Sequence, residues 1–124
     1  MDIYKVNEIA AGKLVYNPNV SKQYTSAFAS DLMSDVLRYY MENTILITGL
    51  CTLQAIRTAE MSGITCIIFG RCKHITQEML LLAEENGIAV IESGLTLFEI
   101  SGKLFQNGID RKSTRLNSSH LAES

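Results

Sequence analysis

The sequence predicts an α/β protein in which a mostly parallel sheet lies between two helical layers, a three-layer α/β/α sandwich. Short strands with the composition of fully buried parallel β alternate three times with segments long enough to be crossover helices. The clearest unit, from Thr44 to Arg71, holds a strand at 45–48, a helix at 52–61 and a strand at 64–69. Short connections between such units are typical of a parallel sheet covered on both faces.

Further elements are predicted on both sides of this unit. They are a helix at 2–11, strands at 14–16 and 24–29, a helix at 31–41, a helix at 76–86, a strand at 88–91 and a helix at 96–107. We expect Gly12 to end the first helix in the left-handed conformation. Ser30 is expected to cap the second helix, with Asp31 in its first turn. The apolar residues of that helix are expected to be buried: Leu32, Met33, Val36, Leu37 and Tyr40.

Composition bounds the class of protein. The chain has 124 residues, 47% of them apolar, with one Pro and no Trp, which fits one globular domain with a core. A net charge of −2 gives no electrostatic reason to expect nucleic acid or an anionic membrane as partner. No signal-peptide core or membrane-spanning run is present, so a cytoplasmic protein is expected. The odd cysteine count, from Cys51, Cys66 and Cys72, favours a reducing compartment.

The end of the chain is interpreted separately. The stretch from Asp110 to His120 resembles the translation of a common sequencing-library adapter, and its polar composition cannot form a packed helix face or strand. We therefore expect a folded domain at 1–109 and a non-native, disordered tail at 110–124. A natural disordered tail is the alternative. The basic residues of this tail are not interpreted as a nucleic-acid-binding arm.

The candidate site lies in the three loops that follow the strands at 45–48, 64–69 and 88–91. The carboxyl ends of parallel strands meet at one edge of a sheet, and ligands of such folds bind there. Glycine lets a ligand approach the backbone, helix N-termini favour anions, and Arg71 and Lys73 add positive charge. Neither a dinucleotide fingerprint nor a P-loop is present, and glycines needed only for the turns are the alternative. The residues predicted to bind a nucleotide or phosphorylated metabolite are Thr48, Gly49, Cys51, Gly70, Arg71 and Ser93.

A catalytic interpretation centres on Cys51. Its position at a helix start could lower the pKa of the thiol, and His74 could pair with it if the two loops are neighbours. The alternative is a small side chain that fills a turn. Asp31 and Asp35 lie four apart on a predicted helix, but helix-start preference and solvation explain them. No catalytic residue, metal site or cofactor is predicted.

Four segments of the chain resemble the stand-alone bacterial members of the DRTGG domain family: 30–36, 45–50, 56–61 and 97–99. The resemblance covers nearly all of residues 1–109. The family is named for a Gly-Asp-Arg after one strand and a Thr-Gly-Gly after the next. The corresponding stretches here, 49–51 and 69–71, match only at Gly49 and Gly70. The roles of the Asp, Arg and Thr are therefore not carried over to this chain.

The resemblance implies a domain similar to the N-terminal domain of HPr kinase. Such domains are regulatory or accessory modules beside CBS domains, phosphotransacetylases and inorganic pyrophosphatases, and stand-alone copies are often encoded near redox enzymes. We therefore expect a non-catalytic binding module that has a redox or regulatory protein as partner and senses a nucleotide or phosphorylated metabolite at the strand-end loops. The small size and high aliphatic content of the domain also predict a homo-oligomer. The alternative is a small enzyme acting on a phosphorylated substrate through Cys51 or the loop from Arg71 to His74.

Overall fold

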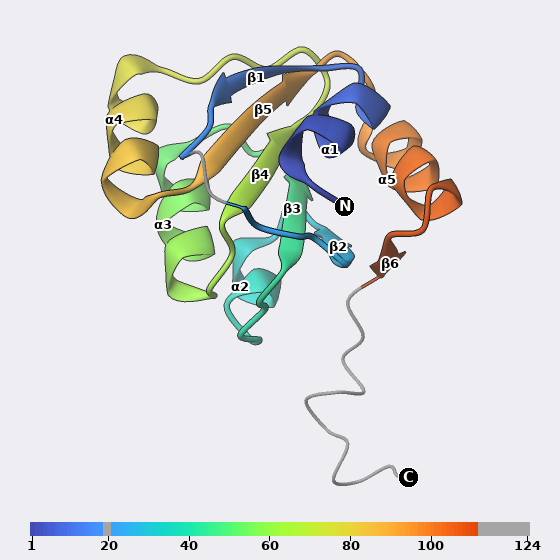
Figure 1. Ribbon diagram of the computed structural model, residues 1–124. Helices are drawn as coiled ribbons and strands as arrows, with labels where there is room; N and C mark the ends of the chain where they lie inside the picture. Colours follow the sequence, from blue (N-terminus) through green and yellow to red (C-terminus); the bar gives the residue numbers. More distant parts are fainter. Residues whose placement is uncertain (19–20, 112–124) are drawn as a thin grey trace, which may run out of the picture.

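A six-stranded mixed sheet is the centre of the computed structural model, which describes residues 1–18 and 21–111. The order across the sheet is β1-β5-β4-β3-β2-β6 (Figure 1). Only β1 runs antiparallel to its neighbour, β5, so the predicted mostly parallel sheet is confirmed. The strands are β1 Gly12–Tyr16, β2 Ser26–Ala29, β3 Thr44–Thr48, β4 Cys66–Phe69, β5 Ala89–Ser93 and β6 Asp110–Arg111.

Helices cover both faces of this sheet, so the predicted three layers are also confirmed. Strands β2 to β5 follow one another in sequence across the sheet, and right-handed crossovers then place every connecting helix on the same face. The helices are α1 Ile3–Ile9, α2 Met33–Val36, α3 Leu53–Met61, α4 Gln77–Asn86 and α5 Leu97–Gln106. Side chains of α2, α3 and α4 share one core cluster with the sheet, and α1 and α5 share the other (Figure 1).

The period-two alternation of the strands divides the core between the two clusters. In β3, Leu46 packs with α2, α3 and α4, whereas Ile45 and Ile47 pack with α1 and α5. Each of these three side chains is fully buried. Aliphatic residues on both faces of a strand are what a doubly covered parallel sheet requires.

Residues 31–41 form much less helix than the sequence predicts. The helix α2 covers only Met33–Val36, begins at Leu32 without a side-chain cap, and Ser30 instead accepts a hydrogen bond from the Leu32 N–H. Met33 and Val36 are buried as predicted, whereas the side chains expected beside them are exposed: Leu32, Leu37 and Tyr40. The helix therefore buries only one turn, and Met41, which is fully buried, enters the same core cluster from beyond its end.

The end of α1 also differs from the prediction. Ala11, not Gly12, takes the left-handed conformation after the helix, with φ of 51°. Gly12 is required for a different reason, because a Cβ there would collide with the side chain of Ile91 on the neighbouring strand. The prediction therefore placed the left-handed residue one position too late.

The chain end contributes one short strand. Asp110 and Arg111 pair with Ser26 and Ala27 of β2 in parallel, so the first two residues of the predicted tail extend the sheet. The rest of that tail, 112–124, lies outside the described residues. Within the part of the chain that the structure covers, no helix has the length and apolar character needed to cross a membrane.

Candidate functional site

The loops after β3, β4 and β5 meet at the carboxyl edge of the sheet. The Gly70 N–H donates to the Thr48 carbonyl at 3.0 Å, the Arg71 N–H to the Leu95 carbonyl at 2.8 Å, and the Cys72 N–H to the Ser93 carbonyl at 2.9 Å. The structure thus brings the residues predicted as the ligand site to one edge. Their side chains differ sharply in what they offer to a ligand.

A carboxylate occupies the centre of this edge. Asp31, in the loop after β2, accepts hydrogen bonds through Oδ1 from the Gly49 N–H at 2.7 Å and from the Thr48 hydroxyl at 3.0 Å. Its Oδ2 lies 3.4 Å from Nη2 of Arg71. The Leu50 N–H donates to the Thr48 hydroxyl at 3.1 Å. The amides of the loop after β3 are therefore directed at protein oxygens.

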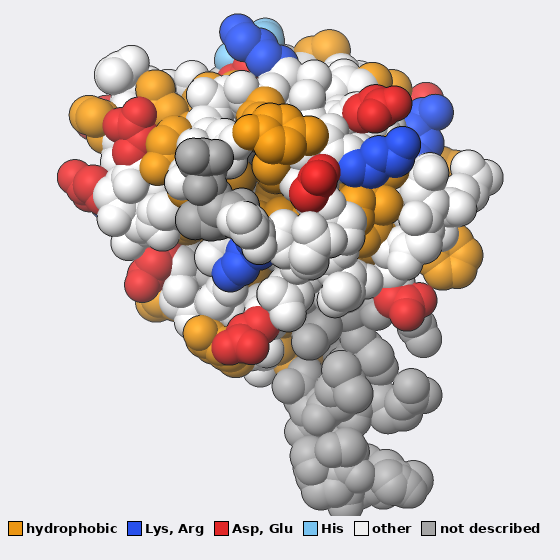
Figure 2. Space-filling model, viewed as in Figure 1, with side chains coloured by type: hydrophobic (Ala, Val, Ile, Leu, Met, Phe, Trp, Pro, Cys, Tyr) orange, Lys and Arg blue, Asp and Glu red, His pale blue; other side chains and the backbone are white. Residues whose placement is uncertain are grey.

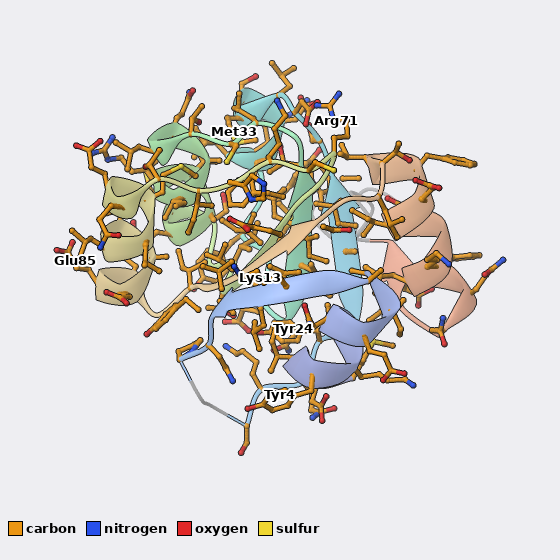
Figure 3. The ribbon with its side chains drawn as sticks, turned by 90° about the horizontal axis from the view of Figure 1, so that it is seen from above. Tyr4, Lys13, Tyr24, Met33, Arg71 and Glu85 are labelled. Atoms are coloured by element: carbon orange, nitrogen blue, oxygen red, sulfur yellow. The ribbon has the colours of Figure 1, made fainter. Side chains whose placement is uncertain are left out.

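Arg71 lies directly over Gly49. A Cβ at Gly49 would overlap the guanidinium, so only glycine permits this arrangement. Arg71 and Cys72 adopt left-handed φ values of 64° and 60°, which are uncommon for residues with a side chain. The backbone bonds to Leu95 and Ser93 hold this turn and fix the direction in which Arg71 leaves it. Figure 3 places Arg71 on the same side as Met33, the first residue of α2.

The exposed charge at this edge is concentrated in one loop. The side chain of Arg71 is 49% exposed and that of His74 is 80% exposed, and Lys73 between them is exposed as well. Figure 2 shows basic and histidine side chains together at the top of the molecule, above the ends of the strands. His74 Nδ1 lies 3.1 Å from Oε1 of Glu92, so an acidic group offsets part of this charge.

Three of the predicted residues have structural roles. The hydroxyl of Ser93 is buried, donates to the Ala10 carbonyl at 2.6 Å and accepts from the Leu95 N–H at 3.1 Å. Thr48 is also buried, and its hydroxyl donates to Asp31 and accepts from the Leu50 N–H. A side chain at Gly70 would press on the Leu95 carbonyl at 3.0 Å. Arg71 is thus the predicted residue that offers an exposed polar group.

Cys51 does not have the environment of a reactive thiol. Burial, and then the nearby charge of Glu92, raise the pKa of the Cys51 thiol, and Lys73 offsets only part of this effect. Its sulfur donates to the backbone carbonyl of His74 at 3.3 Å, while the imidazole of His74 contacts Glu92. The two loops are neighbours, as the catalytic interpretation required, but the thiol is directed at a carbonyl oxygen. Among residues 1–18 and 21–111, no cluster of three or more His, Cys, Asp or Glu is placed to hold a metal ion.

Asp31 is the residue that sequence reasoning missed. It was explained as a helix-start residue, but the helix begins later and the carboxylate turns to the loop after β3. An acidic residue shortly after a strand of a parallel sheet was the available signal, since that position lies at the same edge of the sheet as the loops after the other parallel strands.

A groove between β2 and α5 is a second feature of the molecule. Its volume is about 350 Å³, and its surface is almost entirely apolar. Phe98 and Phe105 of α5 are 87% and 67% exposed at its side. Small and aliphatic side chains form much of its lining: Ala27, Ala29, Ile47 and Gly102.

Comparison with solved structures shows the fold. The chain is similar to the crystal structure of the CBS and DRTGG domains of the regulatory region of Clostridium perfringens pyrophosphatase, complexed with its activator diadenosine tetraphosphate. The TM-score is 0.74 at 11% identity, over 99% of this chain and 61% of that chain. This likeness supports the DRTGG-like fold that the sequence resemblance implied. No protein-family model matches the chain, and no curated protein matches it in sequence.

Proposed function

We propose that this protein is a regulatory or accessory binding module that takes an anionic ligand, a nucleotide or a phosphorylated metabolite, at the carboxyl edge of its sheet. The observation that carries the proposal is the half-exposed guanidinium of Arg71, held over Gly49 beside the exposed Lys73 and His74. Redox or regulatory proteins are the partners that such a module would serve.

The geometry of Arg71 supports a phosphate ligand. A guanidinium presents five N–H donors in a planar fork that matches a phosphate or carboxylate. In this structure Arg71 has one contact to Asp31, at the long distance of 3.4 Å. Both side chains are 49% exposed, and an exposed pair of this kind contributes about 0.2–1 kcal/mol. Within residues 1–18 and 21–111, the other side-chain donors of Arg71 have no hydrogen-bond partner, so they can meet an incoming anion.

The structural neighbour supports the choice of ligand class. The regulatory region of the pyrophosphatase binds a dinucleoside polyphosphate as its activator, and its fold extends over nearly all of this chain. A nucleotide is accordingly the first ligand to test. The site proposed for this chain rests on its own Arg71 loop.

A thermal-shift screen tests the proposal. Adenine and guanine nucleotides, dinucleotides and phosphorylated metabolites are added to the wild type, to Arg71→Ala and to Arg57→Ala, an exposed arginine of α3 that serves as the matched control. A ligand at about a hundred times its dissociation constant adds roughly 2.7 kcal/mol of stability, which for a domain of this size raises Tm by roughly 10 °C.

The expected result is a shift in the wild type and in Arg57→Ala that is lost in Arg71→Ala. A shift that survives in Arg71→Ala would place the ligand elsewhere. No shift with any compound would leave protein association as the function to pursue.

We further propose that the module self-associates through the exposed stripe of α5. Phe98 and Phe105 flank Gly102, where a Cβ would meet nothing within 4 Å, so a second helix can approach closely between two aromatic side chains. The apolar groove beside the stripe would receive the same side chains from a second copy, as a two-fold dimer requires. Light scattering at tens of micromolar protein is expected to show a dimer, and a monomer would contradict this.

A further inference from the structure

We infer that the carboxylate of Asp31 already occupies part of the anion site, so that a ligand phosphate must displace it and in doing so releases the loop between β2 and α2. This inference rests on the proposed function, because it concerns how the same site is regulated. The Asp31 carboxylate would compete with the ligand for the same donors. The loop between β2 and α2 would then change position when the ligand binds.

The donors around Asp31 are those that a phosphate would use. They are a backbone N–H at 2.7 Å, a hydroxyl at 3.0 Å and a guanidinium at 3.4 Å, from Gly49, Thr48 and Arg71. Both oxygens of the carboxylate are engaged, and the donors come from two different strand ends. Phosphate and carboxylate oxygens accept from the same kinds of donor, so one can replace the other.

The carboxylate is able to leave this position. The side chain of Asp31 is 49% exposed, and its loop precedes a helix of four residues that has no side-chain cap. Leu32, next to it, is 59% exposed, so little packing holds these two residues in place, whereas the Ser30 N–H before them donates to the Ile47 carbonyl at 3.0 Å. The following part of the segment is anchored, because Met33 and Val36 are buried and the Ser62 hydroxyl donates to the Val36 carbonyl at 3.0 Å.

The movement is therefore confined to Asp31, Leu32 and the start of α2. That region carries the apolar side chain of Leu32, which is 59% exposed. A ligand at Arg71 would change how this apolar surface is presented, and a partner protein could sense the change. Binding at the sheet edge is thereby linked to a surface outside the site.

Backbone amide NMR with inorganic pyrophosphate as probe tests the inference. The proteins are the wild type, Asp31→Asn and Asp31→Ala. Asp35→Asn is the matched control, because it also removes one carboxylate of the same segment. In the wild type, the amides of Gly49 and Leu32 should shift along one saturable curve that Arg71→Ala abolishes. Affinity should rise about tenfold in Asp31→Ala if the site is open a tenth of the time, and should change little in Asp35→Asn. Asp31→Asn removes the charge while keeping the shape, and it should give an intermediate gain.

The outcomes separate the two proposals. Saturable binding through Arg71 with no shift at Leu32 would overturn the displacement, even if Asp31→Ala binds more tightly, and would leave the proposed site standing. If pyrophosphate binds to Asp31→Ala but not to the wild type, the result would support competition by the Asp31 carboxylate. It would also count against pyrophosphate binding as a function of the wild type. No binding by any of the proteins would overturn both.

Discussion

Tyr24 shows at the scale of one residue how burial alters chemistry. Its side chain is 2% exposed and lies in the cluster that contains Cys66. Burial raises the pKa of Tyr24 most, the interaction with Cys66 raises it further, and the pKa is about 12. A hydrogen bond with Thr65 has the opposite effect and lowers this pKa. Cys66 is fully buried in the core, and this burial also raises the pKa of its thiol.

The raised pKa of Tyr24 predicts a loss of stability at high pH. A group whose pKa is higher in the folded state stabilises that state below its unfolded pKa of 10, and this contribution is lost as pH rises through about 12. Urea unfolding at pH 8 to 11 should show a steeper decline for the wild type than for Tyr24→Phe. Tyr4→Phe, at a side chain 61% exposed, should behave as the wild type. Equal slopes in all three proteins would refute the assignment.

The helix α5 shows what capping does at the scale of an element. The Thr96 hydroxyl accepts from the Glu99 N–H at 3.1 Å, and Oε1 of Glu99 accepts from the Thr96 N–H at 2.9 Å, a reciprocal capping box. The Thr96 hydroxyl also donates to Oε1 of Glu99 at 3.2 Å. The two bonds that this carboxylate accepts from Thr96, first the one from the backbone N–H and then the one from the hydroxyl, lower the pKa of Glu99. At α4 the Thr76 hydroxyl accepts from the Met79 N–H at 3.2 Å, but the reciprocal bond is absent because Met79 stands where a carboxylate would be needed.

Removing the Thr96 hydroxyl tests this cap. Thr96→Ala should lower the free energy of unfolding by about 1 kcal/mol, since an N-cap threonine contributes about 0.5–2 kcal/mol. The pKa of Glu99 should rise only part of the way toward its ordinary value in an NMR titration, because Thr96→Ala removes the hydroxyl bond and keeps the bond from the backbone N–H. Because that pKa is depressed in the folded state, the contribution of the box is present at neutral pH and is lost as pH falls through it. Thr96→Ser keeps the hydroxyl and is the control; a cap is contradicted if both variants lose the same stability.

The strand order decides the surface of the whole molecule. Because β2 to β5 follow in sequence, α2, α3 and α4 all lie on one face, and the other face has only α1 and α5. Beyond α5, the small side chains of Ala27 and Ala29 on β2 line the open groove. The apolar stripe of α5 borders this groove. The surface of the proposed dimer contact is therefore exposed because of the strand order.

Replacing the stripe tests its role at this scale. The double variant Phe98→Ser and Phe105→Ser should be a monomer by light scattering where the wild type is a dimer. Its monomer stability should change little, because both side chains are more than half exposed and contribute little to the core. Leu81→Ser, at an exposed side chain of α4, is the control and should leave the dimer intact. A dimer that persists in the double variant would exclude this surface.

The sequence by itself determined five of the six described strands, most of the helices and the edge at which their loops meet, and it missed the short β6. Residues 45–48 and 64–69 are apolar in the way that only doubly covered strands are, and each of the glycines 49, 70 and 87 marks the end of an element. Such signals are local, so the residues themselves carry them. The same local rules predicted a full helix at 31–41, where tertiary packing left one turn.

The tertiary structure alone decided how side chains from separate loops are paired. The local pattern around Asp31 equally fits a helix start, and only the approach of β2 to β3 brings its carboxylate to Gly49 and Arg71. Likewise, the sequence places Phe98 and Phe105 on an amphipathic helix, but the strand order leaves them without cover. Contacts between residues far apart in the chain depend on the three-dimensional arrangement of all elements, which no short stretch of sequence specifies.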